Sequence, residues 1–246
     1  NSEGGSVKLP VPQFTMTSAE RAFVASQPML KVSNEMSWPP FDYAVGGEPR
    51  GYSVDVIRLI GEMTGLQFQF VNGYSWAELI SLFAAGELDV LQSVVPNPEN
   101  TKWGLVSDSY ADVPYALATT EGATKLTSMA QLHGKTLAVP VGWSIIPVVR
   151  EYFPGVTIVE AASTLHALRK VLNGEVDAAL DNEVMLRHVA SHYFLKGLVY
   201  HSDPDFGEAT VADTLRIMTS RSNPKLLKLV NRALSTIELT QRDYLV

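Results

Sequence analysis

Two stretches decide the fold: LFAAGELDVLQS at residues 82–93 and VLNGEVDAALDN at residues 171–182. Both read as the end of a helix, then Gly-Glu-x-Asp, then a short apolar run that suits a buried strand. Gly86 in the first copy corresponds to Gly174 in the second. Such a repeat predicts two similar α/β lobes within one chain.

Helix and strand signals alternate around the first copy. A strand expected at residues 30–33 precedes a helix with Ser53 as its N-cap, and Gly65 ends that helix. A second strand, within LQFQFV at residues 66–71, precedes a capping box in SWAE at residues 75–78. This alternation predicts a parallel sheet in each lobe, with ligand-facing loops beyond the carboxyl ends of the strands.

The chain is expected to cross twice between the lobes, near residues 113–122 and 214–223, so that the two crossings form a hinge. The predicted organisation is a linker and lead-in helix at 1–28, one lobe at 29–116 plus 214–246, and the other at 117–213. NSEGGS at the start reads as linker, and ELTQRDYLV at the end stops within a helical pattern without a cap. We therefore expect an excised soluble piece of a longer chain.

Composition excludes several classes of protein. The 246 residues carry a formal net charge of −7 without a basic cluster, so no nucleic-acid partner is predicted. The absence of cysteine excludes disulfides and thiol catalysis, and fits an oxidising compartment. Neither a P-loop nor a G-x-G-x-x-G motif occurs, so no cofactor is predicted.

Two motifs have weak claims to chemistry. Gly142-Trp143-Ser144 lacks the second glycine of a serine nucleophile elbow, so we expect Ser144 to cap a helix whose free N–H groups suit an anionic or carbonyl oxygen. His188 and His192 have the spacing of a two-histidine metal site, but no Glu lies between them as in H-E-x-x-H. No metal site is predicted.

Aromatic and polar residues near the strand ends are the better candidates for a small-molecule site. Trp38, Tyr74 and Trp76 lie in or beside loops, although one of them can belong to the core, and Trp143 is the aromatic of the other lobe. Each polar candidate can equally be a turn residue. These polar candidates are Gln92, Ser93, Asn97, Asn100, Ser144, Asp181 and Asn182.

The whole pattern resembles the family 3 periplasmic solute-binding proteins over about residues 28–246. The resemblance rests on WPPFDY…GYSVDVIRLI, GELDVLQSVVPNPEN, VSDSY, GKTLAVPVGWS and GEVDAALDN, in family order and at family spacings. It implies an α/β, two-lobed periplasmic-binding-protein-like (type II) fold with two hinge crossings, known as a Venus flytrap. The lead-in TSAERAFVASQP and the YSWAELISLFAAGELDVL variant are most similar to the extracytoplasmic sensor domains of membrane-bound histidine kinases.

The resemblance also implies roles for the candidate residues. Trp38 would pack on the ligand, residues 92–97 would line the first lobe, and Trp143 with Ser144 the second. Asp181 or Asn182 would meet a ligand amine or hydroxyl, and the choice between them stays open. Amino-acid binders of the family commonly place an Arg where Asn100 stands, so a carboxylate ligand should bind about tenfold or more weakly here.

Three functions follow from the resemblance. The first is a sensor domain in the periplasm, tethered to the inner membrane through the rest of its own chain, which closes on a small polar ligand, amino-acid-like or a neutral metabolite. The second is a free substrate-binding protein of an amino-acid-type ABC importer. The third is an enzyme like the cyclohexadienyl dehydratases, with Glu99 or Asp181 as general base, and this reading is the least favoured. A homodimer of the full-length protein is left open.

Overall fold

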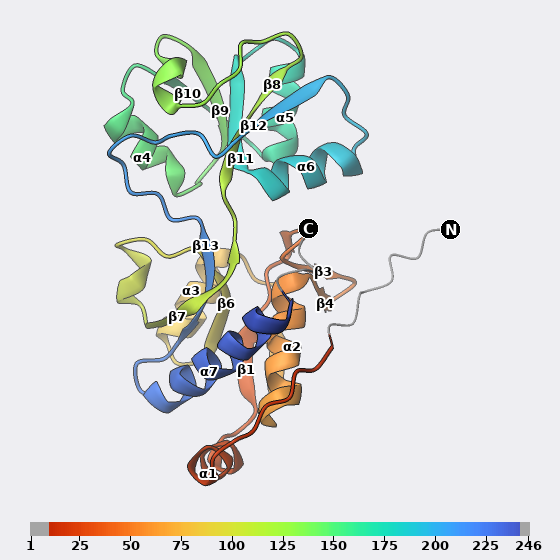
Figure 1. The fold of residues 1–246 in the computed structure, drawn as a ribbon, viewed down its shortest axis with the longest axis vertical. Helices are drawn as coiled ribbons and strands as arrows, with labels where there is room; N and C mark the ends of the chain where they lie inside the picture. Colours follow the sequence, from red (N-terminus) through yellow and green to blue (C-terminus); the bar gives the residue numbers. More distant parts are fainter. Residues whose placement is uncertain (1–9, 242–246) are drawn as a thin grey trace. The chain divides into compact units, whose positions relative to one another are not determined.

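A computed structural model describes residues 10–241, with side chains up to residue 237. The expectations for the linker at residues 1–6 and for the end of the chain after residue 241 lie outside this range. The chain forms two compact units, one of residues up to Ala111 together with those from Leu215, the other from Asp112 to Thr214. The chain thus passes into the second unit once and returns once (Figure 1).

The first unit is built on a five-stranded mixed sheet in the order β5-β1-β6-β13-β7. β1 pairs in parallel with β5 and β6, whereas β13 runs antiparallel to β6. A small antiparallel sheet of three strands follows β1 in the chain. The strands are β1 (Leu30–Ser33), β2 (Ser37–Trp38), β3 (Asp42–Val45), β4 (Glu48–Arg50), β5 (Phe68–Val71), β6 (Val90–Val94), β7 (Leu105–Asp112) and β13 (Thr214–Thr219).

Helices cover both faces of this sheet. α2 (Tyr52–Thr64) and α7 (Pro224–Gln241) share one core cluster with β1, and the lead-in helix α1 (Ser18–Ser26) packs against the same cluster through Phe23 and Val24. α3 (Trp76–Ala84) contributes to a separate cluster with β6. The capping box predicted at Ser75 is confirmed, and Thr17 forms a second capping box at the start of α1.

The start of α2 corrects one prediction. The N-cap is Gly51, with φ of 115°, and not Ser53. A side chain at position 51 would collide with the carbonyl oxygen of Phe41, so only glycine fits there. Ser53 lies buried inside the helix, where its hydroxyl is 2.7 Å from the Tyr110 hydroxyl.

The second unit has a five-stranded sheet in the order β10-β9-β11-β8-β12. β9 is parallel to both β10 and β11, while β8 runs antiparallel to β11 and β12. Its strands are β8 (Tyr115–Thr120), β9 (Thr136–Pro140), β10 (Thr157–Ala161), β11 (Ala178–Asn182) and β12 (Leu198–Ser202). Its α-helices are α4 (Ile145–Tyr152), α5 (Thr164–Leu172) and α6 (Glu183–His192), and short 3₁₀ turns lie at Met129–Leu132 in this unit and at Asn100–Lys102 in the first.

The two faces of this sheet differ in side-chain size. Large residues such as Leu117, Leu137 and Leu180 face the cluster that contains α4. On the other face, alanines at alternate positions, among them Ala138 and Ala179, lie under α5 and α6. Successive side chains of a strand point to opposite faces of the sheet, so leucines lie on one face and alanines on the other. The small alanines let α5 and α6 approach the sheet closely.

The Gly-Glu-x-Asp repeat forms the same joint in both units. Gly86 and Gly174 adopt positive φ values of 77° and 73° at the turn after a helix. Asp89 then accepts a hydrogen bond of 2.8 Å from the backbone N–H of Lys31, and Asp177 accepts one of 2.8 Å from that of Thr136. The repeated Asp therefore ties the start of its own strand to the start of the neighbouring strand.

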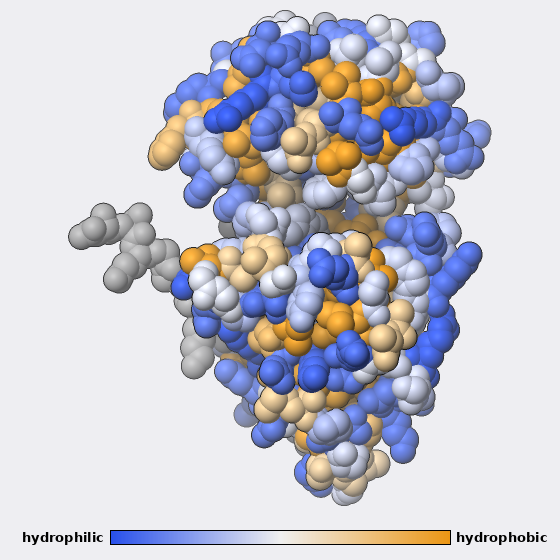
Figure 2. Space-filling model, turned by 180° about the vertical axis from the view of Figure 1, so that it is seen from behind, coloured by the Kyte–Doolittle hydropathy of each residue, from blue (hydrophilic) through white to orange (hydrophobic). Residues whose placement is uncertain are grey.

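Among the described residues, no helix is long and apolar enough to span a membrane. On the face shown in Figure 2, apolar side chains lie among hydrophilic ones in each unit.

Candidate functional site

In the first unit, polar side chains gather around Asp42 where β1 and β6 end. Asp42 is fully buried, and its Oδ1 accepts hydrogen bonds from Asn34 Nδ2 at 2.8 Å, Gln92 Nε2 at 2.9 Å and the backbone N–H of Glu35 at 3.0 Å. Its Oδ2 accepts from Ser93 Oγ at 2.7 Å. β1 supplies the loop with Asn34 and Glu35, and β6 supplies Gln92 and Ser93, so the carboxyl edge of the parallel strands assembles the cluster.

Burial dominates the electrostatics of this cluster. It raises the pKa of Asp42, although four hydrogen bonds to its carboxylate act in the opposite direction. Burial, followed by the charge of Asp42, raises the pKa of Glu35 to about 8, while a hydrogen bond from Ser93 opposes the rise. At neutral pH the two neighbouring carboxyl groups therefore hold a proton on Glu35.

The aromatic corner WPPF lies beside this cluster. Trp38 pairs with Asp42 in the small sheet and is half-buried, and its ring centroid lies 5.1 Å from that of Phe41. Phe41 is buried and anchors the corner in the first unit. The rigid proline pair thus holds Trp38 next to the acidic cluster, on the strand-end edge where the sequence places it.

The other aromatic candidates of this unit are Trp76 and Tyr74. Trp76 is the first residue of α3 and packs against the core between α3 and β6. Tyr74 is 40% exposed in the preceding loop. Trp76 thus packs against the core of the first unit, and ligand contacts by Trp76 or Tyr74 stay a prediction.

Asn97 and Asn100 use their side chains inside their own loop. Asn100 Oδ1 accepts from the backbone N–H of Asn97, and its Nδ2 donates to the Val95 carbonyl at 2.9 Å. Asn97 Oδ1 accepts from the backbone N–H groups of Glu99 and Asn100. The loop that would hold the family arginine is stabilised by these amides, and ligand contacts by either Asn stay a prediction.

In the second unit, Asp181 organises the strand-end residues. Its carboxylate is buried and accepts hydrogen bonds from Trp143 Nε1 at 2.8 Å, Thr164 Oγ1 at 2.6 Å and the backbone N–H of Asn182 at 2.7 Å. Burial raises the pKa of Asp181 to about 6 in spite of these three donors. Asp181 therefore fixes the orientation of the Trp143 indole.

The residue before α4 corrects a second prediction. Ser144 is the N-cap of α4, but its side chain makes no capping hydrogen bond. Its hydroxyl bonds instead to the buried Tyr115 hydroxyl, whose pKa is raised mainly by burial. Asn182, at the N-cap of α6, donates its Nδ2 to the Val113 carbonyl.

The structure thus brings Trp38, Gln92 and Ser93 together in the first unit, and Trp143, Asp181 and Asn182 in the second. It adds residues that sequence reasoning missed: Asn34, Glu35, Asp42, Tyr110 and Thr164. The available signal was the acidic and amide content of SNEMSWPPFD, which flanks the aromatic corner.

The histidine pair forms a ring contact on α6. The rings of His188 and His192 stack with centroids 6.1 Å apart, and burial followed by the neighbouring His192 lowers the pKa of His188. Across residues 10–237, no three His, Cys, Asp or Glu side chains are grouped to hold a metal ion.

These features define a two-unit α/β protein with an aromatic side chain and a buried carboxylate at the strand-end edge of each unit. Residues 30–242 match the bacterial extracellular solute-binding proteins, family 3, and the chain belongs to that family.

Two curated relatives are sensor proteins. The virulence sensor protein BvgS of Bordetella pertussis is 24% identical over 235 residues, covering 95% of this chain and 19% of BvgS. The sensor protein EvgS of Escherichia coli K12 is 22% identical over 223 residues, covering 90% of this chain and 18% of EvgS. The chain therefore spans about a fifth of the length of these relatives.

Among solved structures, the periplasmic VFT2 domain of Bordetella pertussis BvgS is similar, with a TM-score of 0.72 and 23% identity. The similarity covers 93% of this chain and 96% of that domain, and shows that the two share a fold.

Proposed function

We propose that the chain is an extracytoplasmic sensor domain, which binds a small polar molecule and passes the resulting change to a membrane-attached output such as a histidine kinase. The observation that carries this proposal is that an aromatic side chain and a buried carboxylate occur together in each unit. Trp38 lies opposite Asp42 in the small antiparallel sheet, and Trp143 donates a hydrogen bond to Asp181. The names of BvgS and EvgS, both sensor proteins, support the signalling part.

Signalling requires that the ligand bind one conformation of the domain better than another. We expect α7 to transmit the conformational change, because it packs in the same core as α2 and the lead-in helix. By analogy with the periplasmic VFT2 domain of BvgS, the domain would lie in the periplasm, and we expect it to be tethered through the rest of its own chain. A homodimer of the full-length protein stays an expectation.

We propose a binding role rather than catalysis. A general base needs a free lone pair in reach of a substrate proton. Asp181 already accepts three hydrogen bonds from the protein, and Glu99 lies exposed at the edge of a loop. Tyr115, a titratable neighbour of Asp181, is buried, and burial is the main cause that raises its pKa.

The alternative within this family is a free periplasmic binding protein that supplies an importer, which the family's description as solute-binding proteins favours. Both readings predict ligand binding and differ in the segment expected after this domain in the full-length chain. A downstream membrane span and kinase module would support the sensor, whereas a stop codon directly after this domain would support the importer.

A thermal-shift screen tests the binding claim. The chain is tested with amino acids, small carboxylates, polyamines, nucleosides and neutral polar metabolites at millimolar concentrations. A ligand at a hundred times its dissociation constant adds about 2.7 kcal/mol to the free energy of unfolding, which gives a clear rise in melting temperature.

The double variant Trp38→Ala/Trp143→Ala should lose that rise. Phe194→Ala, which removes an aromatic ring that is 83% exposed elsewhere in the second unit, is the matched control and should keep it. An unchanged rise in the double variant would contradict the proposal.

A further inference from the structure

The second unit has a cavity at the edge of its sheet opposite to Trp143 and Asp181. It is lined by the residues that precede β9 and β11, including Lys135 and Asp177, and by the end of β8 at Thr119 and Thr120. Trp143 and Asp181 lie at the other ends of β9 and β11, about 15 Å away for a strand of five residues. The cavity is therefore separate from the candidate site described above.

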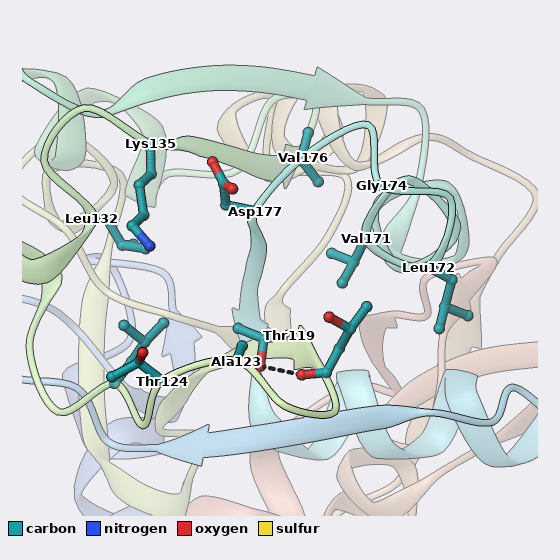
Figure 3. A pocket seen from close by; sticks show the side chains of 12 residues that line it. Thr119, Ala123, Thr124, Leu132, Lys135, Val171, Leu172, Gly174, Val176 and Asp177 are labelled. Carbon is teal, nitrogen blue, oxygen red and sulfur yellow. Dashed lines mark hydrogen bonds between the residues drawn. The ribbon is translucent and has the colours of Figure 1, made fainter.

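The cavity has a volume of about 290 Å³, which is enough for a small metabolite. Its lining includes buried aliphatic side chains, among them Leu126, Val171 and Val176. In Figure 3, Lys135 and Asp177 lie side by side on one wall, while Val171, Val176 and Leu172 lie across the cavity from Lys135. One wall is thus charged and the facing wall aliphatic.

A buried histidine makes hydrogen bonds to two of the residues that line the cavity. His201 Nδ1 accepts a hydrogen bond of 3.0 Å from the backbone N–H of Leu126, so its Nε2 carries the proton and donates to Thr119 Oγ1 at 2.8 Å. Burial, together with the charge of Lys125, lowers the pKa of His201 and keeps this arrangement neutral. These two hydrogen bonds orient the Thr119 hydroxyl and the backbone of Leu126 at the cavity.

The charged groups on the wall are free to meet a ligand. Among the described residues, no ion pair or hydrogen bond engages the Lys135 ammonium, although its charge helps to lower the pKa of Asp177. Asp177 uses Oδ2 to accept from the backbone N–H and hydroxyl of Thr136, which leaves Oδ1 available. The equivalent Asp89 of the first unit makes the same backbone anchor to the neighbouring strand.

We propose that this cavity is a second binding site that takes a small zwitterion with an aliphatic part. A ligand carboxylate would bind the Lys135 ammonium, a ligand ammonium would bind Asp177 Oδ1, and the aliphatic part would cover Val171 and Val176. Lys135 and Asp177 carry opposite charges, so a ligand with a single charge satisfies one of them and leaves the other unpaired. The hydroxyls of Thr120 and Thr124 at the rim supply further polar contacts.

Three probes with the same branched tail separate these contributions. L-leucine carries both charges, 4-methylpentanoate lacks the amine, and 3-methylbutylamine lacks the carboxylate. Each is titrated into the ¹⁵N-labelled 246-residue chain carrying Trp38→Ala/Trp143→Ala, so that the aromatic site is weakened. We expect leucine to shift the amide signals of residues 119–126, 132–136 and 171–177, and to bind at least about tenfold more tightly than either other probe.

Lys135→Gln and Asp177→Asn should each weaken leucine binding about tenfold. Asp89→Asn is the matched control, because it weakens the same backbone anchor in the first unit and should leave leucine binding unchanged. The proposal is overturned if leucine shifts no signals in these segments, if the singly charged probes bind as tightly, or if Asp89→Asn weakens binding as much as Asp177→Asn.

Discussion

Glu35 retains its proton far more strongly in the folded chain than an ordinary carboxyl group does. Its pKa rises from 4.5 to about 8, so between these pH values the folded chain holds a proton that the unfolded chain has released. This contribution to stability is fully present below pH 4.5 and is lost as the pH rises through about 8.

Replacing Glu35 with Gln removes that pH dependence. We expect the free energy of unfolding of Glu35→Gln to rise relative to wild type as the pH increases from 5 to 8, by on the order of 2 kcal/mol over that range, allowing for solvent screening at a partly exposed group. Urea unfolding at several pH values measures this. Glu87→Gln changes an exposed carboxyl group and serves as the control, so its free energy of unfolding should depend on pH as that of wild type does. The assignment would be contradicted if Glu35→Gln also kept the wild-type pH dependence.

Thr164 is one of the three donors to buried Asp181. Thr164→Val keeps the shape but removes the hydroxyl, so we expect a loss of about 1–3 kcal/mol in the free energy of unfolding and a further rise in the pKa of Asp181. Thr164→Ser retains the donor and should stay close to wild type. A loss in Thr164→Ser as large as that in Thr164→Val would contradict the assignment, because Ser keeps the donor to Asp181.

At the scale of the element, the start of α2 depends on glycine. Gly51→Ala would place a methyl group against the Phe41 carbonyl, and we expect a loss of about 3 kcal/mol or more. Gly73→Ala has a φ of 90° and open space around it, so backbone strain alone should cost about 1 kcal/mol. Thermal and urea unfolding compare the two, and equal losses would show that strain, rather than collision, determines the requirement.

The lead-in helix is attached to α7 through Arg232. Its guanidinium donates to both oxygens of Glu20, at 2.7 and 2.8 Å, and to the Thr15 carbonyl, and it lies 4.3 Å from the Phe14 ring centroid. The hydrogen bonds from Arg232 also lower the pKa of Glu20. α1 buries no residue fully, so this clamp is expected to be a large part of its attachment.

We expect Arg232→Ala to speed hydrogen exchange throughout residues 14–26. A double-mutant cycle with Glu20→Ala should give a coupling of about 1 kcal/mol. Arg232→Lys keeps the charge but not the paired geometry, and should fall between wild type and Arg232→Ala. A coupling near zero would show that apolar packing by Phe23 and Val24 is sufficient to hold the helix.

For the whole molecule, the two-unit fold could be predicted because its signals are local. Gly86 with Asp89, and Gly174 with Asp177, each complete a turn and a strand anchor within a short segment, so the repeat is visible in sequence. The N-cap at Gly51 could not be predicted in the same way, because its glycine requirement comes from the approach of the Phe41 carbonyl.

The candidate site could be predicted only in part. Aromatic corners and strand ends can be recognised in a sequence, which therefore predicts Trp38, Trp143 and Asp181 near the carboxyl ends of the strands. The Asp42 cluster was missed because its partners Gln92 and Ser93 lie about fifty residues away along the chain. The side chain of Asn100 makes its hydrogen bonds within its own loop, and the residue type alone does not show which partners an amide will have.

The measurement that tests the sensor proposal most directly is ¹⁹F NMR of the chain labelled with 5-fluorotryptophan, titrated with a compound from the thermal-shift screen. Four tryptophans give four signals, which single Trp→Phe variants assign. We expect the signals of Trp38 and Trp143 to shift with one common dissociation constant, while Trp76 and Trp103, packed against the core cluster of α3, stay nearly unchanged. Signals of Trp38 and Trp143 that stay unchanged at saturating concentrations of the compound would contradict the proposal that these side chains bind the ligand.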